Sequence, residues 1–281
     1  MVYFSCGERA GRLLLIVHHL VIDGVSWRIL LEDLAAARAQ LAAGKEASAV
    51  ELPARTSSYQ QWAQQLQQYA GSAALQEEVG YWKEVAAAAR RQREEARWEA
   101  EHEGGDAERS AGGMQQVRLS REQTRVLLQQ APEVYHTQIQ EVLLTALGRA
   151  WERWSGRAQV VVEMEGHGRE EVAPGLDLTR TVGWFTSLYP VVLRSRVGEE
   201  RVTALKRVKE QLRHVPQRGI GYGVLRELSE SAEVREQLQV ESEVSFNYLG
   251  QFDQVLGGEG SPGVWQHAGE SVGQLWGASN G

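Results

Sequence analysis

Cysteine is almost absent from this sequence of 281 residues, which contains only Cys6. A single cysteine excludes an intramolecular disulfide and a cysteine-based zinc site, and it favours a reducing, cytoplasmic compartment. No apolar run approaches the roughly 18 residues that a membrane-spanning helix needs, and the first residues lack the apolar stretch of a signal peptide. An excess of positive charge is absent too, because the formal net charge is −7. That balance argues against a surface for nucleic acid or anionic membrane.

The rest of the composition is ordinary for a soluble globular protein, with 42% hydrophobic and 24% charged residues. The length suits one large domain or two lobes. Short apolar runs typical of buried strands alternate with segments of helical periodicity, which predicts the α/β class. The strands are expected at 12–18, 160–164, 189–193 and 245–249, and helices include 74–89, 137–154 and 202–215.

A change of composition suggests where the chain divides. Residues 90–113 are rich in Glu, Arg and Ala and then in Gly, and they contain almost no core residues. Such a composition is typical of a solvated linker. The sequence therefore predicts two lobes, 1–113 and 114–281.

Two histidines stand at the end of the first expected strand, in HHLVIDGVSW at residues 18–27. Adjacent side chains on a strand point to opposite faces, so only one of His18 and His19 can face a given cavity. The same divergence makes the pair unsuited to a shared metal ion. An imidazole accepts a proton near neutral pH, which makes this a candidate acid/base site. The alternative is a buried histidine pair beside an ordinary turn.

A sharp turn follows the histidines and leads into a helix. Asp23 and Gly24 form a dipeptide typical of turns, and the Asp23 carboxylate can hold the local geometry by accepting hydrogen bonds. Ser26 stands where an N-cap belongs, before residues at helical spacing. The segment is therefore expected to be strand, turn, helix.

A carboxylate closes another expected strand, in EGHGRE at residues 165–170. The two glycines of this segment allow backbone and ligand to approach closely. Partial desolvation would raise the pKa of Glu165 towards a useful acid/base value. The alternative is a polar turn with solvated charges.

Three further segments combine aromatic residues with glycines or an amide. Trp184 suits the floor of a tunnel or a plain core turn. Tyr222 lies among three glycines, but its segment lacks the lysine and the strand-to-helix context of a phosphate loop. Asn247, if buried, needs hydrogen-bond partners. The segments are RTVGWFTSLYP at 180–190, PQRGIGYG at 216–223 and FNYLGQFD at 246–253.

Together and in this order, the five motifs resemble those of nonribosomal peptide synthetase epimerization domains, a branch of the condensation-domain superfamily. The segment at 136–151 also looks like the core helix of that branch, except that Glu141 stands where an aspartate is usual. The resemblance spans nearly the whole chain. It implies a two-lobed, chloramphenicol acetyltransferase-like α/β sandwich.

The family has a substantial portion before the histidine motif that this sequence does not include. The resemblance therefore implies that the first part of the N-terminal lobe is missing and that the C-terminal lobe is cut short. Missing strands would leave sheet edges and apolar surface uncovered.

The resemblance implies an isomerase that inverts an α-carbon from L to D. Its substrate is an aminoacyl or peptidyl thioester on the 4'-phosphopantetheine arm of a peptidyl carrier protein, and an adenylation domain is a further partner. His19 and Glu165 match the two acid/base positions of the family, and either one could be the base. No metal or bound cofactor is implied, because the thioester itself acidifies the α-proton.

Softer assignments concern the surroundings of those two groups. His18, Asp23, Gly24 and Arg169 are expected to support the site, with Asp23 paired to an arginine such as Arg169. The side chains expected to line the substrate tunnel are Trp184, Tyr222 and Asn247.

Two other functions compete with epimerization. In a condensation domain that forms a peptide bond, His19 would orient or deprotonate an attacking amine and Glu165 would have no role. In a non-catalytic remnant or carrier-docking module, neither side chain would react. The EGHGRE and FNYLGQFD motifs favour epimerization.

Overall fold

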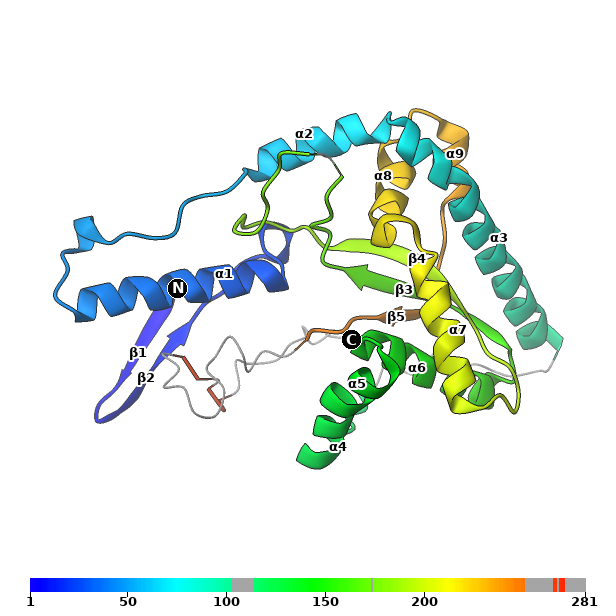
Figure 1. Ribbon diagram of the computed structural model, residues 1–281, viewed down its shortest axis with the longest axis horizontal. Helices are drawn as coiled ribbons and strands as arrows, with labels where there is room; N and C mark the ends of the chain where they lie inside the picture. Colours follow the sequence, from blue (N-terminus) through cyan, green and yellow to red (C-terminus); the bar gives the residue numbers. More distant parts are fainter. Residues whose placement is uncertain (103–113, 173, 251–264, 267, 271–281) are drawn as a thin grey trace, which may run out of the picture. The chain divides into compact units, whose positions relative to one another are not determined.

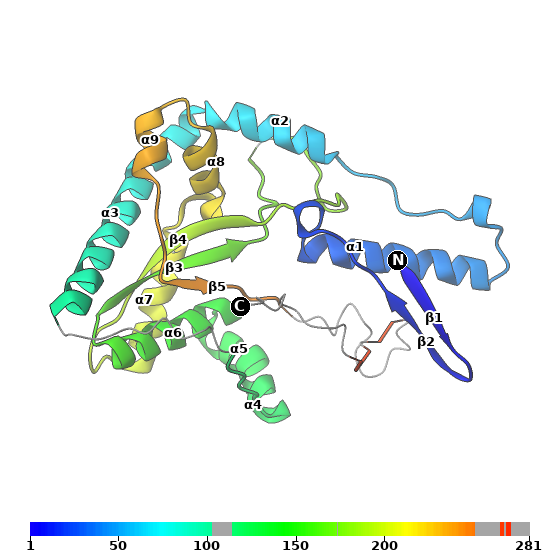
Figure 2. The same ribbon diagram turned by 180° about the vertical axis from the view of Figure 1, so that it is seen from behind.

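The computed structural model describes residues 1–102, 114–172, 174–250, 265–266 and 268–270, and it gives the side chains of all of these except 98–102 (Figures 1 and 2). The chain divides into two compact units, each assembled from segments that are far apart in the sequence. The first unit consists of Met1–Tyr59, Asp177–Phe185 and Leu249–Gly281, and the second of Gln60–Leu176 and Thr186–Tyr248. Each unit thus contains residues from before and after the expected boundary at 113. The division into lobes 1–113 and 114–281 stays a prediction.

The first unit begins with an antiparallel hairpin, β1 (Val2–Cys6) and β2 (Arg9–Leu14), followed by a 3-10 turn, η1 (His19–Val21). The long helix α1 (Gly24–Ala42) and the short η2 (Ala47–Ala49) come next. The expected strand 12–18 is thus wrong at its C-terminal end. Pairing stops where Leu14 meets Val2 near the start of β1, and beyond it the N–H of Val21 bonds to the carbonyl of His18 at 3.1 Å.

The second unit is built on a three-stranded sheet in the order β4-β3-β5. Antiparallel pairing joins β3 to β4, and parallel pairing joins β3 to β5. This mixed sheet with its helices confirms the α/β class. The strands are β3 (Gln159–Gly166), β4 (Ser187–Arg194) and β5 (Val244–Phe246). The helices are α2 (Tyr59–Ala70), α3 (Ala73–His102), α4 (Arg121–Arg125), η3 (Val126–Gln130), α5 (Ala131–Tyr135), α6 (Ile139–Ser155), α7 (Arg201–Arg213), η4 (Pro216–Gly219), α8 (Ile220–Leu228) and α9 (Ala232–Gln237).

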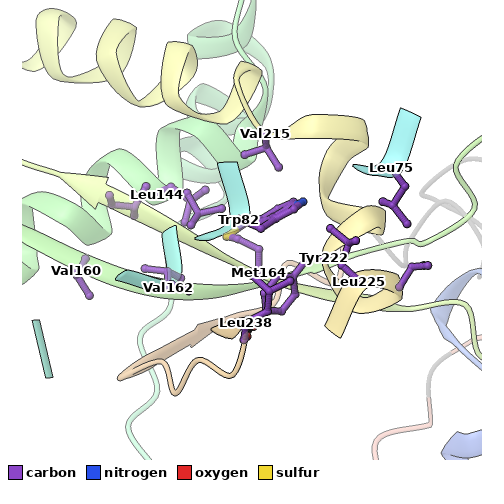
Figure 3. Close-up of a cluster of buried hydrophobic side chains, with 14 of the residues drawn as sticks. Leu75, Trp82, Leu144, Val160, Val162, Met164, Val215, Tyr222, Leu225 and Leu238 are labelled. Carbon is purple, nitrogen blue, oxygen red and sulfur yellow. Dashed lines mark hydrogen bonds between the residues drawn. The ribbon is translucent and has the colours of Figure 1, made fainter. Parts of the chain in front are cut away.

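The core of the second unit follows from the alternation of side chains along β3. Val160, Val162 and Met164 join a large buried cluster with Leu144 of α6 and Trp82 of α3, which Figure 3 shows in close-up. The intervening Val161 belongs to a separate cluster with Val85, Ala88 and Ala89 of α3. Both faces of the strand are therefore buried, which fixes where the strand ends lie in this unit.

Residues 90–102 of the segment expected to be a linker are helical. Helix α3 continues without interruption through Arg90 to His102, and residues 103–113 lie outside the described part of the chain. Glu, Arg and Ala are good helix formers. A stretch with few core residues can therefore continue a helix, and here it does. Within the described residues, no helix has both the length and the apolar character needed to cross a membrane.

Candidate active site

The two histidines of the first motif have different surroundings. The Nδ1 atom of His18 accepts a hydrogen bond from the backbone N–H of Leu20 at 3.2 Å, and His18 thereby caps η1. The ring of His19 is exposed and meets the Trp184 ring edge-on, with centroids 5.9 Å apart. Among the described residues, no hydrogen bond holds the nitrogens of His19. Both histidines are exposed, but only His18 uses a ring nitrogen in a local cap, and the catalytic role of His19 stays a prediction.

Asp23 is the centre of a buried hydrogen-bond arrangement, with only 4% of its surface exposed. One carboxylate oxygen accepts from the backbone N–H of Ser26 at 2.7 Å and caps α1, which begins at the exposed Gly24. The other oxygen accepts from the N–H of Phe185 at 3.1 Å. A single carboxylate therefore joins the histidine motif to the 180–190 motif.

Ser26 does not cap α1, contrary to the prediction from its place in the sequence. Its fully buried hydroxyl donates to the carbonyl of Gly183 at 2.9 Å and accepts from the N–H of the same residue at 3.1 Å. Asp23 takes the cap because it stands one turn earlier, in the extended conformation that an N-cap requires. The Ser26 hydroxyl instead binds a backbone that is distant in the sequence.

The first half of the 180–190 motif is held by further contacts in the first unit. The guanidinium of Arg180 pairs with Glu32 at 3.2 Å and with Asp33, both on α1. The hydroxyl of Tyr59 donates to the carbonyl of Trp184 at 2.7 Å. Burial and the nearby carboxylate of Asp23 raise the pKa of Tyr59, which keeps this hydroxyl protonated as a donor. These contacts hold residues 180–185, which include Trp184, the residue whose ring meets that of His19.

Glu165 lies in β3 of the second unit and is half-buried. In the antiparallel register it pairs with Leu188 of β4, and Gly166 pairs with Ser187. Alternation places its side chain on the face of the strand opposite to Met164. Glu165 therefore lies near the end of a strand, as expected, and its side chain is partly removed from solvent.

The loop after Glu165 carries a short polar chain. His167 accepts the N–H of Arg169 at Nδ1 (3.0 Å), and its Nε2 lies 3.2 Å from Glu170. The other oxygen of Glu170 lies 3.7 Å from the guanidinium of Arg218. Sequence reasoning did not single out Glu170 or Arg218, since only the fold brings 170 and 218 together.

Tyr189 is a second residue that sequence reasoning missed. A Cβ added at Gly219 would overlap its ring, and one added at Gly166 would lie 3.4 Å from it. Both glycines belong to motifs with no local link to Tyr189. The ring thus packs against the backbone of Gly219 and approaches that of Gly166, where the hydroxyl of Ser187 lies nearer.

The other expected site residues lie in the second unit. Arg169 is half-buried and lies within the polar loop, while Asn247 is exposed just after β5. Tyr222 is 2% exposed, and its hydroxyl donates to the carbonyl of Leu238 at 2.7 Å. Burial raises the pKa of Tyr222. These placements give Tyr222 a packing role, and lining of a tunnel by Tyr222 or Asn247 stays a prediction.

The structure thus gathers the expected residues into two groups. His18, His19, Asp23, Gly24 and Trp184 belong to the first unit, and the remaining ones, including Glu165, belong to the second. A shared site for His19 and Glu165 therefore stays a prediction, as does a pairing of Asp23 with Arg169. Across the described residues, no three His, Cys, Asp or Glu side chains are grouped so that they could hold a metal ion.

Residues 2–264 match the family model described as "Condensation domain". The chain belongs to the condensation-domain family. It is 50% identical over 260 residues to a linear gramicidin synthase of Brevibacillus parabrevis, with 91% of this chain and 3% of the relative covered. It is also 43% identical over 250 residues to surfactin synthase subunit 1 of Bacillus subtilis (strain 168), with 88% and 7% covered. The chain thus spans a small part of these curated relatives.

Solved structures agree with this family. The epimerization domain from the third module of tyrocidine synthetase B matches with a TM-score of 0.65 and 38% identity, over 83% of this chain and 51% of that one. The first condensation domain of the calcium-dependent antibiotic synthetase matches with a TM-score of 0.58 and 21% identity, over 83% and 48%. The chain therefore has the chloramphenicol acetyltransferase-like fold of condensation-type domains and spans about half of a solved domain.

Proposed function

We propose that this condensation-family chain carries the epimerization chemistry: inversion from L to D of the α-carbon of an aminoacyl or peptidyl thioester held on a carrier protein. The observation that carries the proposal is Glu165, a half-buried carboxyl in β3 that opens the EGHGRE segment. The 38% identity to a solved epimerization domain also supports it, whereas 21% identity to a condensation domain supports the fold alone.

Inversion requires that a proton leave one face of the α-carbon and return to the other. An imidazole and a partly desolvated carboxyl are both suited to this task near neutral pH. The ring nitrogens of His19 make no hydrogen bond among the described residues, and the residue is exposed, so the imidazole is open to substrate. We assign His19 and Glu165 as the acid/base pair, and either of them could remove the proton from the L isomer.

The 180–190 motif has contacts with the motifs of both groups. Its first part is bonded to Asp23, four residues after His19, through the N–H of Phe185. Its second part begins with Ser187, which pairs with Gly166 beside Glu165. Only Thr186 separates the two anchored residues in the sequence.

The developing enolate needs a hydrogen-bond donor as well as a base. The indole Nε1 of Trp184 is buried, and no acceptor for it is found among the described residues. Because its ring contacts that of His19, Trp184 is our candidate for lining the substrate channel. The domain is proposed to use no metal or cofactor of its own, with the 4'-phosphopantetheine thioester supplied by a peptidyl carrier protein and loaded through an adenylation domain.

Solvent exchange at the α-carbon tests the proposal. The full chain is mixed in D₂O with a panel of L-aminoacyl thioesters on a phosphopantetheinylated carrier protein, and deuterium uptake and chirality are measured after hydrolysis. We expect uptake and D product with the parent chain, and at least a hundredfold lower uptake with His19→Ala or Glu165→Ala, since proton transfer by one group is worth about 10²–10⁴ in rate. Parental rates in both variants would remove the assignment.

The same reagents separate the alternatives. A condensation domain would form a peptide bond only when a second loaded carrier is added, and Glu165→Ala would leave that reaction unchanged. A non-catalytic carrier-docking module would bind the loaded carrier without exchange or bond formation.

A further inference from the structure

The turn at the start of the 216–223 motif has an unusual backbone. Gln217 and Arg218 have φ values of 41° and 50°, and Gly219 follows with φ 88°. Non-glycine residues seldom adopt the left-handed region, and each costs of order 1 kcal/mol. Two in succession persist only where surrounding contacts hold them, so the contacts of this turn are informative.

The backbone just after the two strained residues is held by a partly buried ring and a buried carboxylate. Gly219 lies against the ring of Tyr189, and Gly221 lies so close to Glu78 that a Cβ there would overlap the carboxylate. Trp82 joins these two contacts, because its ring meets that of Tyr189 edge-on at 6.5 Å and its Nε1 donates to Glu78 at 3.0 Å. Trp82 is fully buried. The turn thus rests on a single connected support.

The same support reaches the residue after Glu165. The ring that packs on Gly219 also approaches Gly166, and Arg218 pairs with Glu170 of the loop beyond it. The Glu165 side chain projects to the strand face opposite to Met164, whereas Tyr189 pairs with Met164 and shares its face. Tyr189 therefore contacts the strand from behind the carboxyl.

We infer that Tyr189, which packs against Gly219 and approaches Gly166, is a positioning residue that fixes the backbone at Glu165. This inference rests on the proposed function of Glu165. Acid/base catalysis demands hydrogen-bond reach to the proton that is transferred, and a small displacement of a reacting group can cost about a hundredfold in rate. A strained turn that presses an aromatic ring against the strand supplies such precision.

Gly219→Ala tests this packing, because its Cβ would displace the Tyr189 ring. Gly175→Ala is a matched control: Gly175 has φ 90°, close to the 88° of Gly219, but a Cβ there would meet nothing within 4 Å. We expect Gly219→Ala to lower kcat for α-proton exchange at least tenfold with KM changed less than twofold, and Gly175→Ala to match the parent. Equal kcat in the two variants would overturn the inference.

Substitution of the ring itself provides a second test. Tyr189→Phe keeps the ring and should keep the parental rate, whereas Tyr189→Ala should lower kcat and shift the limb of the pH–rate profile that Glu165 controls. If Tyr189 contributed only to stability, Tyr189→Ala would lower the melting temperature and leave the Glu165 limb of the pH–rate profile unchanged.

Amide hydrogen exchange keeps the inference testable if the parent shows no α-proton exchange and the proposed function fails. Protection of residues 164–167 should fall at least tenfold in Tyr189→Ala and Gly219→Ala but not in Tyr189→Phe or Gly175→Ala. Unchanged protection in all four variants would show that the ring does not fix this backbone.

Discussion

The two candidate catalytic groups are held by opposite kinds of contact. In the first unit, the segments around His19 are fixed by polar side chains that bond to backbone, chiefly Asp23 to Phe185 and Ser26 to Gly183. In the second unit, the positioning that we infer for Glu165 comes from an aromatic ring that packs against Gly219 and approaches Gly166.

The difference has a physical consequence. Hydrogen bonds donated to a buried carboxylate are directional, and loss of one partner leaves the other polar group buried without a hydrogen bond. Packing of a ring is spread over many atoms that each contribute little. The first unit should therefore depend on single polar atoms, and the second on shape.

The largest expected effect is that of Asp23→Ala. The variant removes the N-cap of α1, worth about 0.5–2 kcal/mol, and leaves the buried N–H of Phe185 without an acceptor, at a cost of about 1–3 kcal/mol. We expect α1 and residues 183–185 to lose amide protection by about 2–4 kcal/mol. Hydrogen exchange followed by mass spectrometry measures the loss segment by segment.

Asp177→Ala is the matched control for Asp23→Ala. Asp177 lies in the same unit, but it is exposed, and within the described part of the chain its carboxylate bonds only to the nearby Thr179. Its replacement should have a much smaller effect on amide protection. If the two variants lost equal protection, a single buried carboxylate would not be what orders the first unit.

Sequence patterns predicted the elements better than the contacts between them. Helical periodicity located α6 and α7, and short apolar runs located β3 and β4, each to within a few residues, because both patterns report burial directly. The cap at Asp23 was missed in favour of Ser26, since the partner of Ser26 is Gly183, 157 residues away along the chain. No local pattern reveals such a partner.

For the candidate site too, the sequence predicted individual residues better than the contacts between them. The types and positions of His19 and Glu165 follow from motifs that are continuous in sequence. The packing of Tyr189 does not, because it joins a strand, a turn and a strand end that become neighbours only in the folded unit. Glycine-rich motifs indicated close backbone approach, but not which side chain approaches.

A smaller effect is expected where the second unit does use a buried polar group. Burial raises the pKa of Glu78 above its ordinary value near 4.5, although hydrogen bonds from Trp82 and Tyr69 oppose the shift. A raised pKa means that the folded state holds the proton over a pH range in which the unfolded state has lost it. Stability should therefore fall as pH rises above about 4.5, and Glu78→Gln should flatten that fall.

Chemical denaturation at a series of pH values measures the slope for Glu78→Gln. Glu84→Gln, an exposed position on the same helix, serves as control and should retain the parental slope. A Glu78→Gln slope equal to that of the parent would mean that this carboxyl does not titrate with folding.

The smallest effect is expected for Arg180→Gln, which tests whether every polar contact of the first unit matters as much as Asp23. Arg180 pairs with Glu32 and Asp33, but the arginine side chain is 24% exposed and that of Glu32 is 53% exposed. Exposed pairs contribute about 0.2–1 kcal/mol each and are screened by salt. Loss of α1 protection should be small at low salt and should shrink towards that of Arg28→Gln, an exposed site on the same helix, at about 1 M salt. A salt-independent loss as large as that of Asp23→Ala would instead place Arg180 in one cooperative network with the buried carboxylate.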